Sequence, residues 1–156
     1  MVPYFRTDML KPGEYWHQMP TDGKYTEHYV QLAEGPAPVG VVIARKLIEM
    51  GAIAAACTDL TLGRMKLIGG DFRCLVAEGC LGELLDQLRA ANEGKWAGLS
   101  DAIGIFGDGR VALREAKVAG KDPLSRAQHG FARVAQELLG DRLDLAVVEW
   151  SYEEAP

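Results

Sequence analysis

The sequence has little of what several protein classes require. It contains 3 cysteines among 156 residues and no Cys-x-x-Cys spacing, which excludes a disulfide scaffold and a paired-cysteine metal or redox motif. No apolar run approaches the ~18 residues of a membrane span, and the first residues, MVPYFRTDML, lack the apolar core of a secretory signal. These absences favour a cytoplasmic protein with no membrane partner.

Basic residues are also sparse and scattered. The chain carries 17 Lys and Arg against 22 Asp and Glu, a net charge of −5, and its longest basic run is Arg45-Lys46. Nucleic-acid binding needs a basic stripe that displaces phosphate counterions, so no nucleic-acid partner is expected. A hydrophobic share of 48% and a charged share of 25% are typical of a globular chain whose length suits one domain.

The chain divides into an N-terminal arm and a domain. Residues 1–27 are rich in proline and glycine, which predicts an irregular arm. The arm also holds five aromatic residues, too many for a freely solvated tail, so we expect it to pack against the domain or a neighbouring subunit. Residues 28–156 are predicted to form a single α+β domain.

Hydrophobic periodicity predicts three helices and a series of short strands in that domain. A glycine turn, Gly69-Gly70-Asp71, predicts a hairpin, and Gly107-Asp108-Gly109 predicts another. The helices are expected to begin at Pro38, near Leu81 and at the cap Asp122-Pro123. Strands are expected at 29–33, 52–57, 58–62, 65–68, 72–77, 102–106, 110–113 and 143–147.

This order predicts an α+β fold. The expected architecture is a ferredoxin-like β-α-β-β-α-β sandwich, with an added hairpin, helix and strand at the C-terminus. The helices are expected to cover one face of a mainly antiparallel sheet. The strand at 72–77 is apolar on nearly both faces and is therefore expected at the centre of the sheet. The third helix is expected to bury one stripe, made of Leu124, Ala127, Phe131, Val134 and Leu138.

Most catalytic and cofactor motifs are missing. There is no phosphate-binding P-loop and no dinucleotide-binding glycine motif after a strand, so no cofactor is expected. The segment 98–102 imitates part of a nucleophile elbow but precedes a strand instead of following one. Glu14 and His17 have the spacing of a helical metal-ligand pair, yet the surrounding prolines disfavour a helix, so no metal site is predicted.

The candidate acid–base residues are His17, His28 and Asp71. The two histidines could meet in space, and Asp71 with Arg73 forms either a charge pair at a loop mouth or an ordinary surface turn. His129 is expected to be a solvated helix residue. No nucleophile has an adjacent base and no carboxylate pair lies in an apolar run, which argues against an enzyme.

The cysteines and tryptophans have ordinary structural interpretations. Cys57, Cys74 and Cys80 lie in mostly apolar segments and are expected to be small buried side chains. Trp96 and Trp150 are expected to be core or interface anchors.

One segment carries a family resemblance. Residues 68–84, IGGDFRCLVAEGCLGEL, contain a glycine turn, an apolar strand and a Gly-x-x-Gly pattern that leads into a helix. With Leu32-Ala33-Glu34 and the helix at 39–50, this stretch resembles bacterial microcompartment shell domains over about residues 29–94. The resemblance implies flat cyclic oligomers that tile into a sheet. It also implies a central pore for small metabolites, lined by Ile68, Gly69, Gly70 and Asp71.

Two functional hypotheses follow. The first is a non-catalytic, homo-oligomeric structural or interaction protein, and the resemblance makes it a shell component. Its motivation is the aromatic arm and a sheet whose edges would otherwise invite uncontrolled pairing. The second is a small lyase, isomerase or hydrolase, or an accessory subunit of a larger enzyme. Its acid–base site would lie between subunits and use His17, His28 or Asp71.

Overall fold

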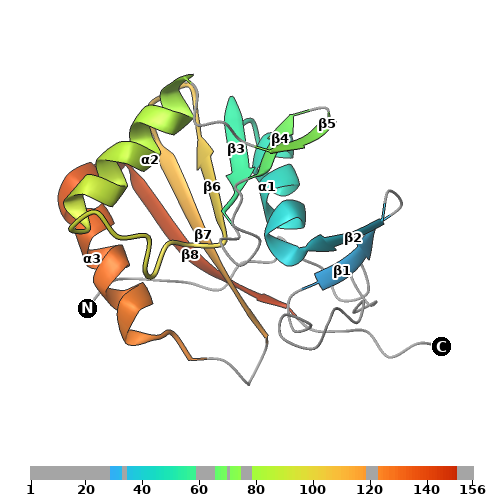
Figure 1. The fold of residues 1–156 in the computed structure, drawn as a ribbon. Helices are drawn as coiled ribbons and strands as arrows, with labels where there is room; N and C mark the ends of the chain where they lie inside the picture. Colours follow the sequence, from blue (N-terminus) through green and yellow to red (C-terminus); the bar gives the residue numbers. More distant parts are fainter. Residues whose placement is uncertain are drawn as a thin grey trace.

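The described part of the chain is built around a six-stranded sheet (Figure 1). The computed structural model describes residues 29–32, 35–58, 66–69, 71–74, 79–118 and 123–150, with side chains for 39–58, 79–117 and 123–149. The spatial order is β5 (Asp71–Cys74), β4 (Lys66–Gly69), β3 (Ala54–Cys57), β6 (Ala102–Ile105), β7 (Val111–Val118) and β8 (Leu143–Trp150). A separate hairpin pairs β1 (Tyr29–Leu32) with β2 (Gly35–Pro38). The predicted α+β class is confirmed.

The sheet is antiparallel except at one end. β7 and β8 run parallel, in a register from Val111 opposite Leu143 to Val118 opposite Trp150. Parallel neighbours need a crossover connection, and α3 (Arg126–Leu139) with a 3₁₀ turn at Gly140–Arg142 supplies it. The two hairpins predicted from glycine turns are present as the β4–β5 and β6–β7 pairs.

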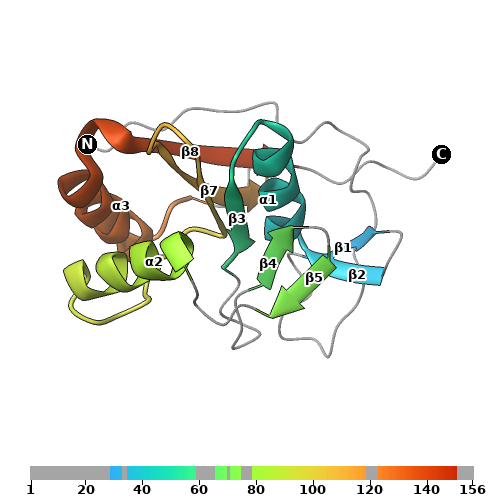
Figure 2. The ribbon, with the colours of Figure 1, turned by 90° about the horizontal axis from the view of Figure 1, so that it is seen from above.

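Helices cover both faces of the sheet, so the expectation of one covered face is wrong. Figure 2 shows α1 (Val39–Glu49) on one side, and α2 (Gly79–Ala91) with α3 on the other. Along β6, Ala102 belongs to the core beneath α1, whereas Ile103 belongs to the core beneath α2 and α3. The reason is the strand composition, because β3 and β6 have apolar residues at successive positions and so need cover on both sides.

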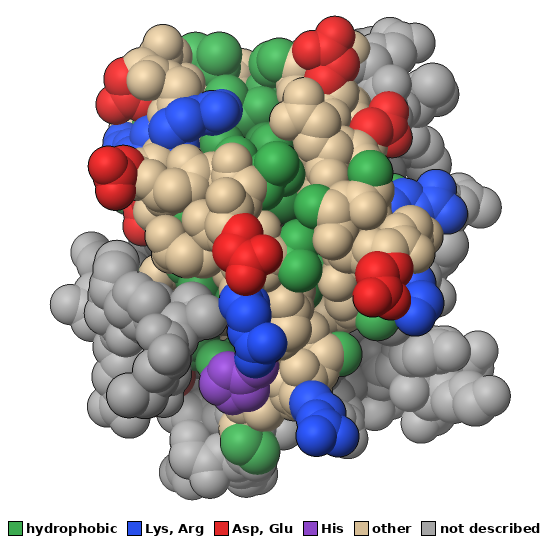
Figure 3. Space-filling model, turned by 90° about the vertical axis from the view of Figure 1, so that its left-hand side faces the viewer, with side chains coloured by type: hydrophobic (Ala, Val, Ile, Leu, Met, Phe, Trp, Pro, Cys, Tyr) green, Lys and Arg blue, Asp and Glu red, His purple; other side chains and the backbone are tan. Residues whose placement is uncertain are grey.

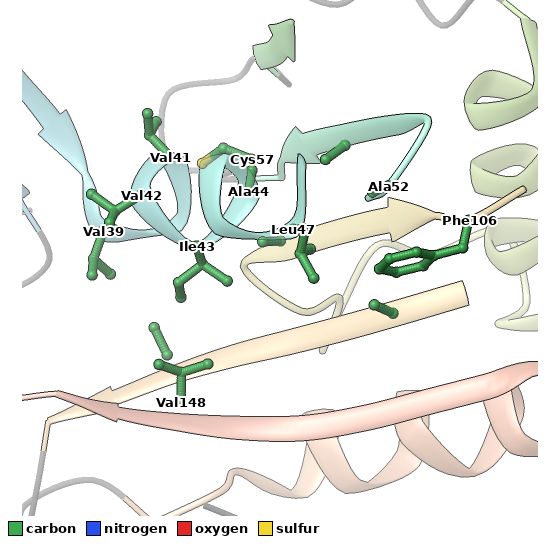
Figure 4. Close-up of a cluster of buried hydrophobic side chains, with 14 residues drawn as sticks. Val39, Val41, Val42, Ile43, Ala44, Leu47, Ala52, Cys57, Phe106 and Val148 are labelled. Atoms are coloured by element: carbon green, nitrogen blue, oxygen red, sulfur yellow. The ribbon is translucent and has the colours of Figure 1, made fainter. Parts of the chain in front are cut away.

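The core on the α1 side is tightly packed (Figure 4). Ile43 and Leu47 of α1 are fully buried, in a cluster that also holds Phe106 and Val148. Gly40 permits this approach, because a Cβ there would lie 2.6 Å from the backbone oxygen of Asp101. The helix ends as predicted, with Gly51 at a φ of 104°.

Two details of α3 correct the prediction. The N-cap is Ser125 and not Asp122, since the Ser125 side chain accepts from the Gln128 N–H and the Gln128 side chain accepts from the Ser125 N–H. The buried stripe is Phe131, Ala135 and Leu139, while Leu138 is 41% exposed and Ala127 is also exposed. Of the predicted stripe, Phe131 is buried as expected, whereas Leu124 lies before the helix begins.

Several further expectations are also wrong. β5 lies at the end of the strand order and not at its centre. Cys80 is exposed, whereas Cys57 is buried as expected. Within the described ranges, no helix has the length and apolar character needed to cross a bilayer.

Gly40→Ala tests the close approach of α1 to the sheet. We expect it to lower the free energy of unfolding by about 1–3 kcal/mol, because the new methyl group meets backbone that cannot rotate away. The matched control is Gly130→Ala in α3, where a Cβ has nothing within 4 Å. The control should raise stability by about 0.5–1 kcal/mol through helix propensity. Urea unfolding of both variants measures the difference, and equal effects would refute the packing argument.

Candidate functional site

A cleft lies where the start of α3 meets the sheet and the loop before β6. The space between its walls, including the part that is open to solvent, is about 370 Å³. The lining comes from that loop, from β7 and β8, and from the first turns of α3. The lining residues are Gly98, Ser100, Glu115, Leu124, Gln128, His129, Ala132, Leu145, Ala146 and Val147.

Gly98 fixes the position of the loop against α3. Its φ is +84°, and a Cβ there would lie 2.0 Å from the backbone oxygen of Ala127. Only glycine combines this conformation with this approach. The loop backbone therefore meets the first turn of α3 directly, which places Ser100 beside the helix start.

Glu115 is the buried carboxyl of the cleft. It extends from β7 toward α3 and is only 7% exposed. Its Oε1 accepts a short hydrogen bond from the Gln128 side-chain nitrogen. Gln128 also accepts the Ser125 N–H at 2.8 Å, so a single amide joins the cap of α3 to the buried acid.

Asp101 is the second carboxyl. The β6–β7 register pairs Ala102 with Arg114, so its continuation by one residue sets Asp101 opposite Glu115. Asp101 Oδ2 accepts the N–H of Ala116 at 2.7 Å. The side chains of Asp101 and Glu115 also hydrogen-bond to each other. The hairpin therefore brings together two carboxyls that lie fourteen positions apart in the sequence.

Burial is the main cause that raises the pKa of Glu115, from 4.5 to about 9, and the Asp101 charge adds to it. The Lys117 ammonium nitrogen lies 3.6 Å from Glu115 Oε1, an ion-pair distance, and acts in the opposite direction. The effects of burial and of Asp101 on the pKa are larger than the effect of Lys117, so Glu115 is protonated at neutral pH. The contact with Lys117 is therefore one between a charged group and a neutral acid.

Two more polar side chains complete the site. Ser100 is only 5% exposed and lines the cleft, yet its hydroxyl makes no hydrogen bond within the part of the chain that the structure describes. Because Ser100 lines the cleft, its hydroxyl can donate to or accept from a group bound there. His129 lines the cleft from α3 and is exposed, as the sequence predicted.

The residues predicted from the sequence lie elsewhere. His17, His28 and Gly70 fall outside the described residues. Asp71 begins β5, where its backbone pairs with Gly69. Strands β4, β3 and β6 lie between β5 and β7, so Asp71 and Glu115 lie on strands that are separated by about 19 Å across the sheet. The side chain of Asp71 is not described, and Asp71 is not brought to this cleft.

Asp101 and Glu115 were missed because each looked unremarkable in its own segment. The sequence has no carboxylate pair within one apolar run, and the hairpin forms this pair from two separate segments. The elbow-like segment 98–102 does lead into a strand, β6, as expected. Among the described side chains, no three His, Cys, Asp or Glu residues cluster as metal ligands.

Comparisons with known proteins returned nothing: no protein-family model, curated protein or solved structure matches the chain. Functional inference therefore rests on the residues of the cleft.

Glu115→Gln tests the buried acid. Between pH 4.5 and about 9 the folded chain holds a proton on Glu115 that the unfolded chain has lost, so folding stability falls as pH rises through this interval. The amide keeps the hydrogen-bonding shape without an ionisable proton. We expect the variant to gain about 1–3 kcal/mol relative to wild type at pH 8 and to lose this advantage below pH 4.5.

Urea unfolding from pH 4 to pH 9 measures this effect. The control is Glu137→Gln, which removes an exposed carboxyl of α3 and should change stability by no more than about 0.5 kcal/mol. A difference between wild type and Glu115→Gln that stays constant over the whole range contradicts a protonated Glu115.

Proposed function

We propose that this protein binds a small molecule in the cleft beside the start of α3 and that Glu115 is the proton-donating group of that site. The observation that carries the proposal is a buried carboxyl with a strongly raised pKa on the wall of an open cleft. Titratable groups with shifted pKa values gather at functional sites. This retains the acid–base alternative considered from the sequence and moves it to a site within one chain.

The surroundings of Glu115 suit proton donation. When the acid gives its proton to a bound molecule, a carboxylate remains in a buried place. The Lys117 ammonium, 3.6 Å from Oε1, stabilises that carboxylate, and the Gln128 side chain continues to donate to it. The pairing with Asp101 holds the proton before transfer. Glu115 therefore has an interacting side chain both when it is protonated and when it is ionised.

Filling the cleft tests the binding proposal. Ala132→Trp places a large side chain on the α3 wall, whereas Ala90→Trp places the same group on an exposed position of α2, away from the cleft lining. A fragment library screened by protein-observed NMR should give ligands that bind wild type and Ala90→Trp alike. Ala132→Trp should weaken these ligands at least tenfold. Fragments that bind all three proteins equally, or none that bind wild type at the cleft, would overturn the proposal.

A second candidate function is the homo-oligomeric role expected from the sequence. One observation favours it: Met50 and Ile53, at the end of α1 and just before β3, are 53% and 65% exposed. Neighbouring exposed apolar side chains are typical of an interaction surface. In a shell-like oligomer, the β4–β5 turn at Ile68, Gly69, Gly70 and Asp71 would surround the pore. This role is compatible with the cleft, because these residues do not line it.

Light scattering at micromolar concentration tests this second role. Wild type should be larger than one chain, and Ile53→Glu should dissociate it because a charge enters an apolar contact. The control is Leu138→Glu, which alters an exposed apolar residue of α3 on the other side of the sheet. A monomeric wild type rules out the oligomer, and electron microscopy of an oligomeric sample shows whether it forms rings or sheets.

A further inference from the structure

We propose that the ligand of the cleft is an uncharged, mostly apolar molecule with one carbonyl or hydroxyl oxygen, held by the Ser100 hydroxyl and the side-chain amide of Gln128. This inference rests on the small-molecule binding proposed above and specifies its ligand class.

The apolar residues that line the cleft favour a ligand with a mostly apolar surface. Leu124, Leu145 and Val147 face the cleft together with Ala132 and Ala146. An apolar ligand surface gains about 25 cal/mol for each Å² that such walls remove from water. A strongly hydrated molecule would gain little and would lose hydrogen bonds to water.

The charges at the cleft argue against a charged ligand. Lys117 and Asp101 carry opposite charges and both act on Glu115, so neither sign is in excess beside the acid. His129 is the remaining titratable residue of the lining, and it is exposed. Figure 3 shows acidic and basic side chains interspersed on the side formed by α2 and α3, around a band of apolar ones. A buried charge needs a partner of opposite sign, and the described part of the cleft offers none to spare.

Two donors remain for an oxygen atom of the ligand. Ser100 is 5% exposed and lines the cleft, and its hydroxyl makes no hydrogen bond to another described residue. The Gln128 nitrogen carries two hydrogens, and Glu115 accepts one of them. A carbonyl or hydroxyl oxygen accepts such donors and brings no charge into the cleft.

A series of probes with one ring and different polar groups tests the ligand class. Cyclohexanone, cyclohexanol, cyclohexanecarboxylate and cyclohexylammonium are titrated into the full-length ¹⁵N-labelled chain. Backbone amide shifts of Gly98, Ser100 and Gln128 report binding in the cleft. We expect the ketone or the alcohol to bind at least tenfold more tightly than both charged probes. Ser100→Ala should weaken that probe about fivefold, the effect of one lost hydrogen bond.

Each outcome decides a different question. A charged probe that binds the cleft more tightly than the neutral ones overturns the ligand class and leaves the proposed site standing. Shifts absent from the cleft amides for all four probes, together with a fragment screen that finds no cleft ligand, overturn both proposals. An unchanged affinity of Ser100→Ala removes Ser100 from recognition. If that variant does not fold, the comparison of the four probes on wild type still decides the ligand class.

Discussion

The burial of the Glu115 carboxyl is the constraint on which the sheet, the start of α3 and the cleft together depend. A carboxylate at 7% exposure is too costly to keep ionised beside a second carboxyl, so the proton remains and the acid becomes a hydrogen-bonding group. Gln128 then ties this group to the cap of α3 through one amide. The hydrogen bond between Gln128 and Glu115 therefore fixes the position of the first turn of α3, and the cleft lies beside that contact.

β7 carries a buried basic residue and a buried acidic residue at successive positions. Arg114 lies on the α1 side of the sheet and is 3% exposed, while Glu115 lies on the α3 side. Asp144 of β8 accepts two hydrogen bonds from Arg114, at 2.6 Å through its backbone oxygen and at 2.9 Å through Oδ2. Burial and the neighbouring Asp101 charge keep Glu115 protonated at neutral pH. The parallel β7–β8 pair is thus fixed by an ion pair on one face, and the neutral acid joins β7 to α3 on the other.

Much of the fold could be predicted from local patterns, because three helices and two hairpins follow from periodicity and glycine turns. The layer arrangement could not, since short strands made of alanine, such as Ala54–Cys57, show no alternation that distinguishes one covered face from two. The start of α3 was misplaced because both Asp122-Pro123 and Ser125 with Gln128 are capping signals, and only the second forms the reciprocal box.

The site was hidden for a different reason. Asp101 precedes one strand and Glu115 lies inside the next, so neither segment shows a pair. A signal was nevertheless present. The predicted hairpin around 107–109 pairs 102 with 114, and one more step in that register sets 101 opposite 115. The partner from α3 had no comparable signal, because the contact of Gln128 with Glu115 depends on how the crossover helix packs on the sheet.

Because Gln128 serves both the helix cap and the acid, the protonation state of Glu115 affects more than the cleft. The side-chain amide nitrogen donates to the acid while its oxygen accepts the Ser125 N–H, so the amide orientation is fixed from both ends. Ionisation of Glu115 strengthens the first of these bonds, since a charged acceptor binds a donor more strongly. It also leaves a charge in a buried site beside a second carboxylate. Burial first, and the Asp101 charge second, outweigh the gain, which is why the pKa of Glu115 is high. A ligand that accepts the proton must therefore provide enough binding energy to offset the burial of this charge and its repulsion by Asp101. This requirement favours molecules that pack against the apolar residues of the cleft over molecules that contact only Glu115.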